Sequence, residues 1–282
     1  MELTAARRSF LCDIGMWADR TALHEAASQG RALQLSRLLD SGAGVNTVTV
    51  DNMTALHEAC IRGNANCVRL LLTAGAQVDV RTVHGSTPLC HACASGSLEC
   101  VRLLLEHGAN MNPSLTALTA SPLHEACING HVDIVELLIS RGAELEAFDV
   151  HFGPPLHIAA AKGHRPCVRA LLRAGACVNS MRFHETALHL AACGGSVELL
   201  ETLITFGADV FYSDNSGKRP RDYAEHGSEG NRCLAFYETC PLSLQQMCRI
   251  SLWSLLGPRA LWVLSDLQTS PRIKSFLLFT DI

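Results

Sequence analysis

Cysteine and histidine are the residues of this chain whose number and spacing could do chemistry. The 282 residues include 13 cysteines and 13 histidines. Cys90 and Cys93 are separated by two residues, the spacing of half a zinc site, and a thiol beside a histidine is the pairing of a nucleophilic enzyme. No second pair of cysteines follows at the spacing that a four-ligand zinc site requires. The spacing by itself therefore predicts no metal site.

A repeat accounts for most of these residues. Six leucines mark it at intervals of 33, 33, 34, 33 and 32 residues: Leu23, Leu56, Leu89, Leu123, Leu156 and Leu188. Most follow a Thr-Ala or Thr-Pro pair, and each has a glycine seven residues later and a Gly-Ala pair that closes its unit. A hydroxyl N-cap, a glycine turn and a glycine C-cap predict that each unit folds as helix, turn, helix and extended loop. One such unit cannot bury its own apolar face, so the units must stack.

The cysteines keep a fixed register within these units. Cys60, Cys93 and Cys127 lie four residues after the marker leucine, where other units have Ala27 and Ala160. Three more lie eleven residues after it, where other units have Ile134 and Leu199: Cys67, Cys100 and Cys167. A cysteine that alternates with such residues is expected to act as a small buried hydrophobe. We therefore predict that these six are structural.

The unit resembles the ankyrin repeat over residues 21–210, in its period and in its Thr-Pro-Leu-His opening. The resemblance implies a curved solenoid whose loops and first helices form one binding surface. It also implies that the histidine column is structural and bonds to backbone at each helix start: His24, His57, His124, His157 and His189. A degenerate, more polar seventh unit that begins at Arg219 is expected to cap the stack.

Composition narrows the classes of function and partner. The 23 basic and 27 acidic residues nearly cancel and form no run of one sign, so neither nucleic acid nor a membrane is an expected partner. The N-terminus lacks the apolar stretch of a signal peptide, and the apolar window at 252–267 is interrupted and too short to span a bilayer. No phosphate-binding loop or nucleophile elbow is present. We expect a cytoplasmic or nuclear protein without catalytic residues, cofactor or metal.

After residue 233 the repeat markers disappear and the chain becomes more apolar. Residues 243–252 are predicted to form a helix with Leu244, Met247, Cys248 and Leu252 on one face. Gly257-Pro258 ends it and starts a second short helix, and Ser270-Pro271 starts a third. So small a bundle cannot bury all its apolar side chains, so the excess must lie on the repeats, on a partner or on both.

This segment resembles the SOCS box, and the whole chain resembles the ankyrin repeat and SOCS box family. The elongin-binding motif of that family is a small residue, leucine, three residues, cysteine, three residues and an aliphatic residue. Ser243, Leu244, Cys248 and Leu252 satisfy it. The resemblance implies that these residues bind elongin, with the leucine and the cysteine in an apolar pocket.

The cullin-binding stretch matches less well. The family usually has a Leu-Pro-x-Pro core, and residues 267–271 keep only Pro271 of it. Ile273, Phe276 and Leu277 keep the apolar spacing that follows. The resemblance implies that these four residues bind a cullin, and we expect the binding to be weaker than in relatives with the full core.

Aromatic residues are scarce in the repeats, so their positions are informative. Between residues 21 and 210 there are only four phenylalanines and no tryptophan or tyrosine. Three of the four lie in two neighbouring loops, with His151 and Met181 beside them: Phe148, Phe152 and Phe183. Exposed aromatics are common anchors of protein interfaces, so we predict that a substrate protein docks at residues 147–153 and 180–185. The alternative is that these rings fold back onto neighbouring hairpins.

Taken together, the sequence predicts an all-α fold of six ankyrin repeats and a degenerate capping repeat, followed by a three-helix SOCS box. The predicted domains are 1–20, 21–232 and 233–282. The resemblance implies a non-catalytic substrate receptor of a ubiquitin ligase whose partners are elongin B and C, cullin-5 with a RING protein, and an unknown substrate. The alternatives are an ankyrin scaffold without ligase coupling, an enzyme with metal-dependent chemistry at the Cys90 region, and a C-terminal segment that is only an apolar cap on the repeats.

Overall fold

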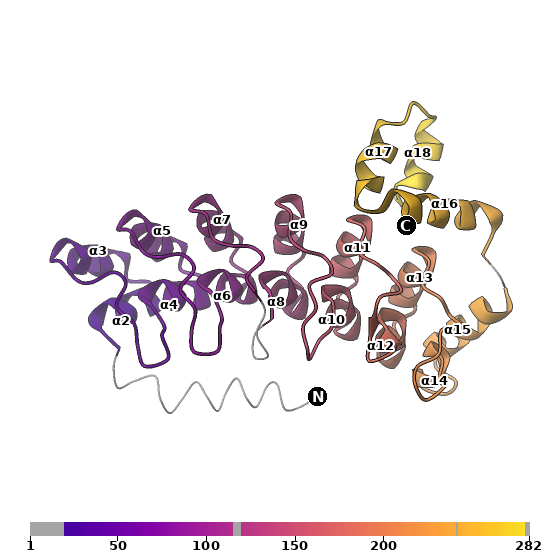
Figure 1. Ribbon diagram of the computed structural model, residues 1–282, viewed down its shortest axis with the longest axis horizontal. Helices are drawn as coiled ribbons and strands as arrows, with labels where there is room; N and C mark the ends of the chain where they lie inside the picture. Colours follow the sequence, from indigo (N-terminus) through magenta and orange to yellow (C-terminus); the bar gives the residue numbers. More distant parts are fainter. Residues whose placement is uncertain (1–19, 115–119, 241, 280–282) are drawn as a thin grey trace. The chain divides into compact units, whose positions relative to one another are not determined.

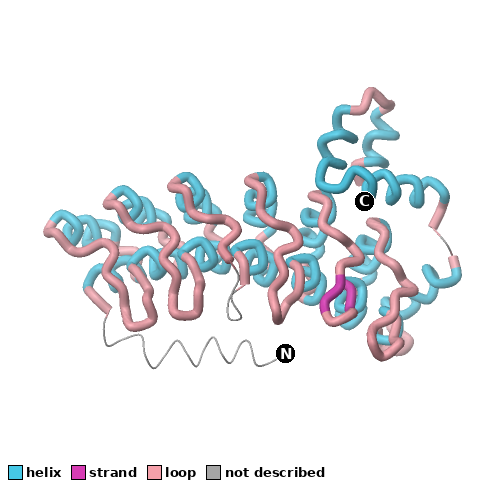
Figure 2. The backbone as a smooth tube through the Cα atoms, viewed as in Figure 1, coloured by secondary structure: helices cyan, strands magenta, loops and turns pink. Residues whose placement is uncertain are grey.

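The computed structural model describes residues 20–114, 120–240 and 242–279, and these described residues form two compact units that divide between Asn129 and Gly130. The lead-in predicted for residues 1–20 lies, apart from Arg20, outside the described residues. Both units are built mainly from helices, as the repeat pattern predicts (Figures 1 and 2). No helix in the described ranges is long and apolar enough to cross a membrane.

The first unit contains paired helices that stack in two rows. Its helices are α2 (Ala22–Ser28), α3 (Ala32–Asp40), α4 (Ala55–Ile61), α5 (Ala65–Thr73), α6 (Pro88–Ser95), α7 (Leu98–Glu106) and α8 (Pro122–Asn129). The first helices of successive repeats, α2, α4, α6 and α8, pack side by side, and α3, α5 and α7 form the second row (Figure 1). Stacking therefore buries the apolar stripe of each helix against its neighbours, as a single repeat could not.

The second unit, taken by itself, also contains paired helices and ends in three further helices. Its elements are α9 (Val132–Ser140), α10 (Pro155–Ala161), α11 (Arg165–Arg173), β1 (Met181–Arg182), β2 (Glu185–Thr186), α12 (Ala187–Gly194), α13 (Val197–Thr205), α14 (Pro220–Tyr223), α15 (Glu229–Thr239), α16 (Leu244–Leu256), a 3-10 turn (Gly257–Arg259), α17 (Ala260–Asp266) and α18 (Pro271–Leu277). The four-residue α14 begins at the position where the degenerate unit was predicted, and the Asp222 carboxylate accepts the Arg219 amide at 2.8 Å.

The Thr-Ala-Leu-His motif that opens a repeat caps the start of its first helix. The Thr54 amide donates to Nδ1 of His57 at 3.1 Å, and the Thr54 hydroxyl lies 2.9 Å from the same nitrogen. On the other side of the ring, a histidine reaches the next repeat: Nε2 of His24 lies 3.0 Å from the Met53 carbonyl oxygen, and Nε2 of His157 lies 3.2 Å from that of Glu185. The column is thus structural, as predicted, and it also joins one repeat to the next.

The loops between repeats end in tight turns. In most of them the residue with left-handed backbone is glycine or asparagine: Asn52, Gly85, Gly153 and Gly217. The loop before α12 differs, because β1 and β2 pair as an antiparallel hairpin with Arg182 opposite Glu185. This small hairpin is an addition to the all-helical fold expected from sequence. It lies in the shortest repeat, since only 32 residues separate Leu156 from Leu188.

The three C-terminal helices form a small bundle, here called the C-terminal box (residues 243–279), with its own apolar core. Trp253, Ala260, Leu264 and Phe279 are buried at its centre. Phe206, at the end of α13, stacks on Phe279 with ring centroids 3.8 Å apart. Part of the apolar excess of the box is therefore buried on the repeats.

Polar and close-packed contacts also hold the box against the repeats near Phe206. The Arg169 guanidinium donates to the Phe279 carbonyl oxygen at 2.6 Å. Gly207 leaves room for the box, because a Cβ added there would lie 2.7 Å from Cγ2 of Ile250. Within the second unit, the C-terminal box thus packs against α11 and the end of α13.

Candidate protein-binding sites

The cysteines that could suggest zinc or thiol chemistry lie in the core. Cys90 and Cys93 are buried, and the Thr87 hydroxyl donates to the Cys90 sulfur at 3.4 Å. Burial raises the pKa of the Cys93 thiol well above its ordinary value, which disfavours the thiolate that a nucleophile or a metal ligand needs. Across residues 20–114, 120–240 and 242–279, no three side chains of the metal-ligating types gather into a candidate site.

The cysteine column predicts how a core substitution behaves. Cys93→Ala should lower the free energy of unfolding by only about 1 kcal/mol, because Ala27 and Ala160 fill the same position in other repeats. Cys93→Ser should lower it by about 1 kcal/mol more, since it buries a hydroxyl among apolar side chains. Urea denaturation of the two variants measures the difference. Equal losses would contradict the interpretation of this column as apolar.

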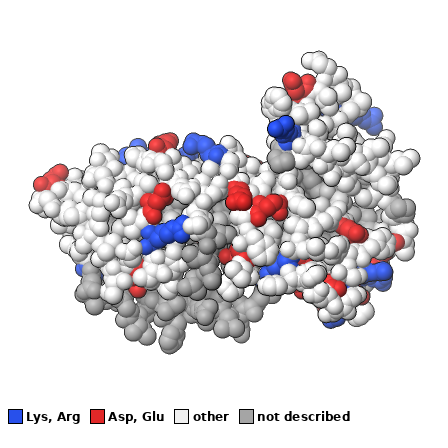
Figure 3. Space-filling view, viewed as in Figure 1, with Lys and Arg blue, Asp and Glu red and all other residues white. Residues whose placement is uncertain are grey.

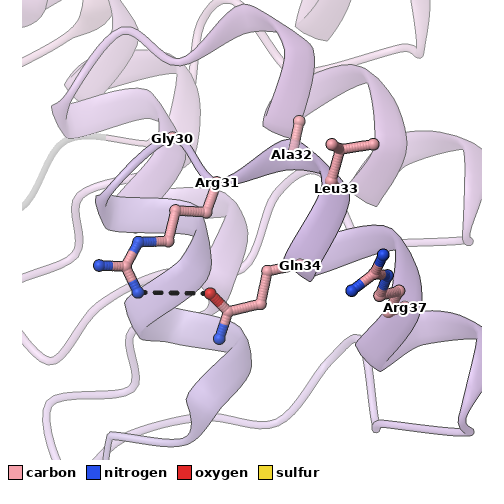
Figure 4. Close-up of a pocket in the computed structure, with 6 residues that line it drawn as sticks. All are labelled: Gly30, Arg31, Ala32, Leu33, Gln34 and Arg37. Carbon is pink, nitrogen blue, oxygen red and sulfur yellow. Dashed lines mark hydrogen bonds between the residues drawn. The ribbon is translucent and has the colours of Figure 1, made fainter.

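A hollow on the surface of the first repeat is the next candidate. It lies at the start of α3 and is lined by Gly30, Arg31, Ala32, Leu33, Gln34 and Arg37 (Figure 4). The Arg31 guanidinium donates to the Gln34 side chain at 3.4 Å, and the lining includes no carboxylate, thiol or histidine. Such a lining offers neither a nucleophile nor a general base, so this hollow is not a candidate for catalysis.

The helix α16 carries an exposed apolar stripe. Leu244 is 79% exposed, Met247 and Cys248 are exposed, and Leu252 is 39% exposed. These residues recur at helical spacing, so they lie on one face. The structure therefore brings together three of the four residues predicted to bind elongin, Leu244, Cys248 and Leu252, as one solvent-facing surface.

Ser243, the fourth residue of that motif, caps the helix. Its hydroxyl accepts the Gln246 amide at 3.3 Å, while the Gln246 side chain accepts the Ser243 amide at 2.9 Å. This reciprocal arrangement is a capping box, and it fixes where the helix begins. The small residue of the motif thereby positions Leu244 in the first turn of α16.

The opposite face of α16 is buried and explains the orientation of the stripe. The Trp253 indole donates to the Leu277 carbonyl oxygen at 2.8 Å. Arg249 is 3% exposed and donates to the Phe276 carbonyl oxygen at 3.1 Å, with its guanidinium 4.0 Å from the centre of the Phe279 ring. Because these two side chains lock one face against α18, the Leu244 face must point to solvent.

The residues predicted to bind cullin do not share one exposed surface. Pro271 and Ile273 are exposed, and the Ser270 hydroxyl caps α18 by accepting the Ile273 amide at 3.4 Å. Phe276 is half-buried under Arg249, and Leu277 packs against the core of the box. Ile273 is thus the most accessible apolar side chain of this set, while Leu277 mainly supports the box.

The residues predicted to bind substrate lie on two neighbouring loop tips of the second unit. Phe148 is 51% exposed, Phe183 is 64% exposed, and Met181 and His151 are also exposed. Phe152 is less exposed than these side chains, because it is half-buried in a turn in which the Asp149 carboxylate accepts its amide at 2.8 Å. Phe148 and Phe183 therefore present their rings to solvent, and Phe152 contributes less surface.

Comparison with known proteins identifies both parts of the chain. The family model described as ankyrin repeats (3 copies) matches residues 6–82, 78–149 and 148–214, and the SOCS box model matches residues 240–278, which include the C-terminal box except Phe279. The chain belongs to the ankyrin repeat and SOCS box family. It is 64% identical to ankyrin repeat and SOCS box protein 13 of Mus musculus over 99% of this chain and all of that protein. It is 49% identical to protein 5 of the family from Homo sapiens, over 94% of this chain and 80% of that protein.

Solved structures agree with the fold of this ankyrin repeat and SOCS box protein. The crystal structure of the human ASB11 ankyrin repeat domain superposes with a TM-score of 0.75 at 39% identity, over 79% of this chain and all of that one. The ankyrin repeat domain of Bcl-3 superposes with a TM-score of 0.63 at 30% identity, over 77% of this chain and 98% of that one. The repeats of this family member are therefore ankyrin repeats, as the sequence predicts.

Two exposed side chains of the SOCS box were not singled out from sequence. Leu255 is 84% exposed and continues the stripe of α16 by one turn, which the predicted end of the helix near Leu252 concealed. Trp262 is 73% exposed on α17 and belongs to no spaced motif. Extending the helical period beyond Leu252 would have found Leu255, whereas Trp262 needed the tertiary structure.

Proposed function

We propose that this chain is the substrate-recognition subunit of an elongin-cullin-RING ubiquitin ligase. The observation that carries the proposal is the exposed stripe of α16, where Leu244, Cys248 and Leu252 face solvent on a helix whose other face is locked. An apolar helix face of this kind fits the groove of a protein partner. It also argues against the box being only an apolar cap, since a cap would turn these side chains toward the repeats.

The proposed role of the chain is to bring proteins together. A receptor of this kind holds its substrate close to a conjugating enzyme, so that lysines of the substrate react at high effective concentration. We place this activity in the cytoplasm or nucleus, with elongin B and C, cullin-5 and its RING protein as the partners. On the face shown in Figure 3, basic and acidic side chains are interspersed without a field of one sign, which favours a protein over a nucleic acid as the partner.

Affinity purification from cells, followed by mass spectrometry, tests this function. The full chain should recover elongin B, elongin C, a cullin and a substrate together, and substrate ubiquitylation should fall when the chain is depleted. Recovery of a substrate without elongins would support the alternative, an ankyrin scaffold without ligase coupling.

The substrate is proposed to dock at residues 147–153 and 180–185. Replacing Phe148, Phe152 and Phe183 with serine should lower substrate capture at least about tenfold, because exposed aromatic rings dominate the energy of such interfaces. Phe236→Ser on α15 is a matched control, since its ring is 57% exposed and lies outside these loops. Capture by the triple variant at the level of the control would place the substrate elsewhere.

Cullin binding is expected to be weak and to depend on Ile273. Titration of the assembled elongin complex should give an affinity for cullin about tenfold below that of a relative with the full Leu-Pro-x-Pro core. Ile273→Ser should weaken it further by removing exposed apolar surface, whereas Arg272→Ser at the adjacent exposed position should not. An affinity equal to that of the relative would show that the core residues missing from this chain are unimportant for cullin binding.

A further inference from the structure

The C-terminal box meets the repeats at the turn that ends α13. The ring of Phe206 stacks on that of Phe279 with an angle of 16° between their planes. On the neighbouring helix α11, the Arg169 guanidinium donates to the Phe279 carbonyl oxygen at 2.6 Å. Gly207 follows Phe206 and faces the side chain of Ile250 on α16. We call these five residues the box joint.

An aromatic ring at this turn is peculiar to the repeat that contacts the box. The five earlier repeats have no phenylalanine, tyrosine or tryptophan before the glycine that closes the unit: Ser41, Ala74, His107, Arg141 and Ala174. The turn itself therefore does not require a ring. The box supplies the reason for one, because Phe279 offers Phe206 an aromatic partner in a stacked geometry.

The box has internal contacts that keep its helices together without the repeats. The Trp253 indole donates to the Leu277 carbonyl oxygen, and Arg249 donates to that of Phe276, so α16 and α18 are held to each other. The box joint is therefore not what packs α16 against α18. It adds a direction, since a stacked ring, a hydrogen bond to a guanidinium and a close glycine contact together restrict rotation of the box about the repeats.

The turn of the box joint is also fastened to a loop proposed to bind substrate. The Asn179 side chain donates to the Gly207 carbonyl oxygen at 2.9 Å and accepts the Asp209 amide at 2.9 Å. Asn179 lies two residues before Met181, the first residue of β1. The loop at residues 180–185 and the box are thus both attached to one short turn, residues 206–209.

We propose that the box joint is a positioning element: it fixes the direction of α16, and with it the stripe proposed to bind elongin, relative to the loop at residues 180–185. The inference rests on the proposed function. A receptor that holds its substrate at a defined distance from the conjugating enzyme raises the effective concentration of particular lysines. The residues of the box joint contribute through the placement of α16 and not through contact with elongin or substrate.

The distance between the repeats and the box measures this placement. Lys162, after α10, and Asp266, at the end of α17, are exposed and lie outside the box joint. Spin labels attached through p-acetylphenylalanine at these two positions leave the exposed cysteines of the chain unlabelled. Double electron-electron resonance on the full chain with elongin B and C should give one narrow distance distribution. A broad distribution in the original chain would overturn the proposal.

Gly207→Ala is the variant that should open the box joint. The added methyl would lie 2.7 Å from Cγ2 of Ile250, whereas carbon atoms pack at about 3.5–4.0 Å, so the box must move. The distance distribution should become at least about twofold wider. Gly142→Ala is the matched control, because its φ of 92° is close to the 98° of Gly207, while its Cβ would meet no atom of the described residues within 4 Å. Equal broadening by both variants would contradict the proposal.

A compensating substitution separates placement of the box from loss of stability. With Ile250→Ala, the nearest remaining atom of residue 250 is Cβ, 3.8 Å from the new methyl, which is an ordinary contact. Gly207→Ala combined with Ile250→Ala should therefore restore the narrow distribution. A general destabilisation by alanine in a left-handed turn would persist in the combined variant, so persistent broadening would count against the box joint.

Elongin affinity, measured by titration on the same preparations, distinguishes the box joint from the ligase function. The Gly207→Ala variant should bind elongin B and C within about twofold of the original chain, because the α16 stripe faces solvent and lies away from this turn. Loss of elongin binding in this variant would show that the box unfolds instead of turning, and would overturn the proposal. Failure of the original chain to bind elongin would count against the ligase function, and the distances measured on the chain alone would still test the box joint.

Discussion

Replacing Leu244 and Cys248 together with glutamine is expected to abolish recovery of elongin B and C. Both side chains are exposed in the free chain and are proposed to enter an apolar pocket on elongin. An amide in such a pocket is desolvated without a partner, and two such changes should weaken binding at least about 100-fold. Pull-down with purified elongin B and C, quantified by titration, measures the loss.

A matched pair of substitutions controls for this experiment. Leu33 is 81% exposed and Cys193 is exposed, and both lie outside the C-terminal box. Leu33→Gln with Cys193→Gln therefore makes the same chemical change at the surface without touching α16. Both double variants should keep the circular dichroism spectrum of the original chain, because glutamine is a good helix former. Full elongin recovery by the α16 variant would rule out this stripe as the elongin site.

Acidification to pH 5 is expected to destabilise the repeats by about 4 kcal/mol through two histidines, about 2 kcal/mol each. Burial lowers the pKa of His57 from 6.5 to about 3 and that of His157 from 6.5 to about 4. The folded state keeps both rings neutral, whereas the unfolded chain takes up protons below pH 6.5. Their stabilising contribution is thus complete above pH 6.5 and is lost as the pH falls toward the folded-state values.

The hydrogen bond from the Thr54 amide acts in the same direction as burial, whereas hydrogen bonds to the backbone of Ser86 and Val80 partly oppose it by raising the pKa of His57. Nδ1 of His57 accepts the Thr54 amide, and a proton on that nitrogen would leave two donors facing each other. Urea denaturation at pH 7 and pH 5 measures the loss of stability.

The third repeat suggests the matched variant, because Cys90 occupies the histidine position behind the cap Thr87. His57→Cys should remove about 2 kcal/mol of the pH dependence. His226→Cys, at an exposed site, should leave the pH dependence unchanged. The same pH dependence in both variants would refute this account of acid sensitivity.

Local contacts were predictable from the sequence, and contacts between repeats were not. The spacing of the marker leucines predicted the paired helices, and the resemblance implied that His57 bonds backbone at its own helix start. The second bond of the column, from Nε2 of His157 to the Glu185 carbonyl, depends on how the next loop lies against the helix. A period read from one chain does not determine that distance.

For the candidate sites too, the sequence predicted local features but not contacts between separate parts of the chain. The spacing at Leu244 correctly predicted that these side chains share one helix face, because helical spacing alone decides this, and the structure shows that the face is exposed. Phe276 and Leu277 follow a similar spacing, yet Arg249 and the core of the box cover much of them. The loop that carries Phe183 belongs to the repeat with the 32-residue spacing, from which no hairpin turn was predicted. Its left-handed backbone could be established only from coordinates.

The stacking of Phe206 on Phe279 changes how inherited or engineered variants of this chain should be classified. By position Phe206 closes an ankyrin repeat, in a column that holds Ser41, Ala74 and His107 in earlier repeats. A missense change at Phe206 would nevertheless remove a contact that holds the C-terminal box, the part proposed to bind elongin. The same holds for Arg169. A variant screen that scores each residue by its annotated domain would assign both to the wrong half of the protein. Variants at Phe206 and Arg169 should therefore be grouped with variants of the SOCS box.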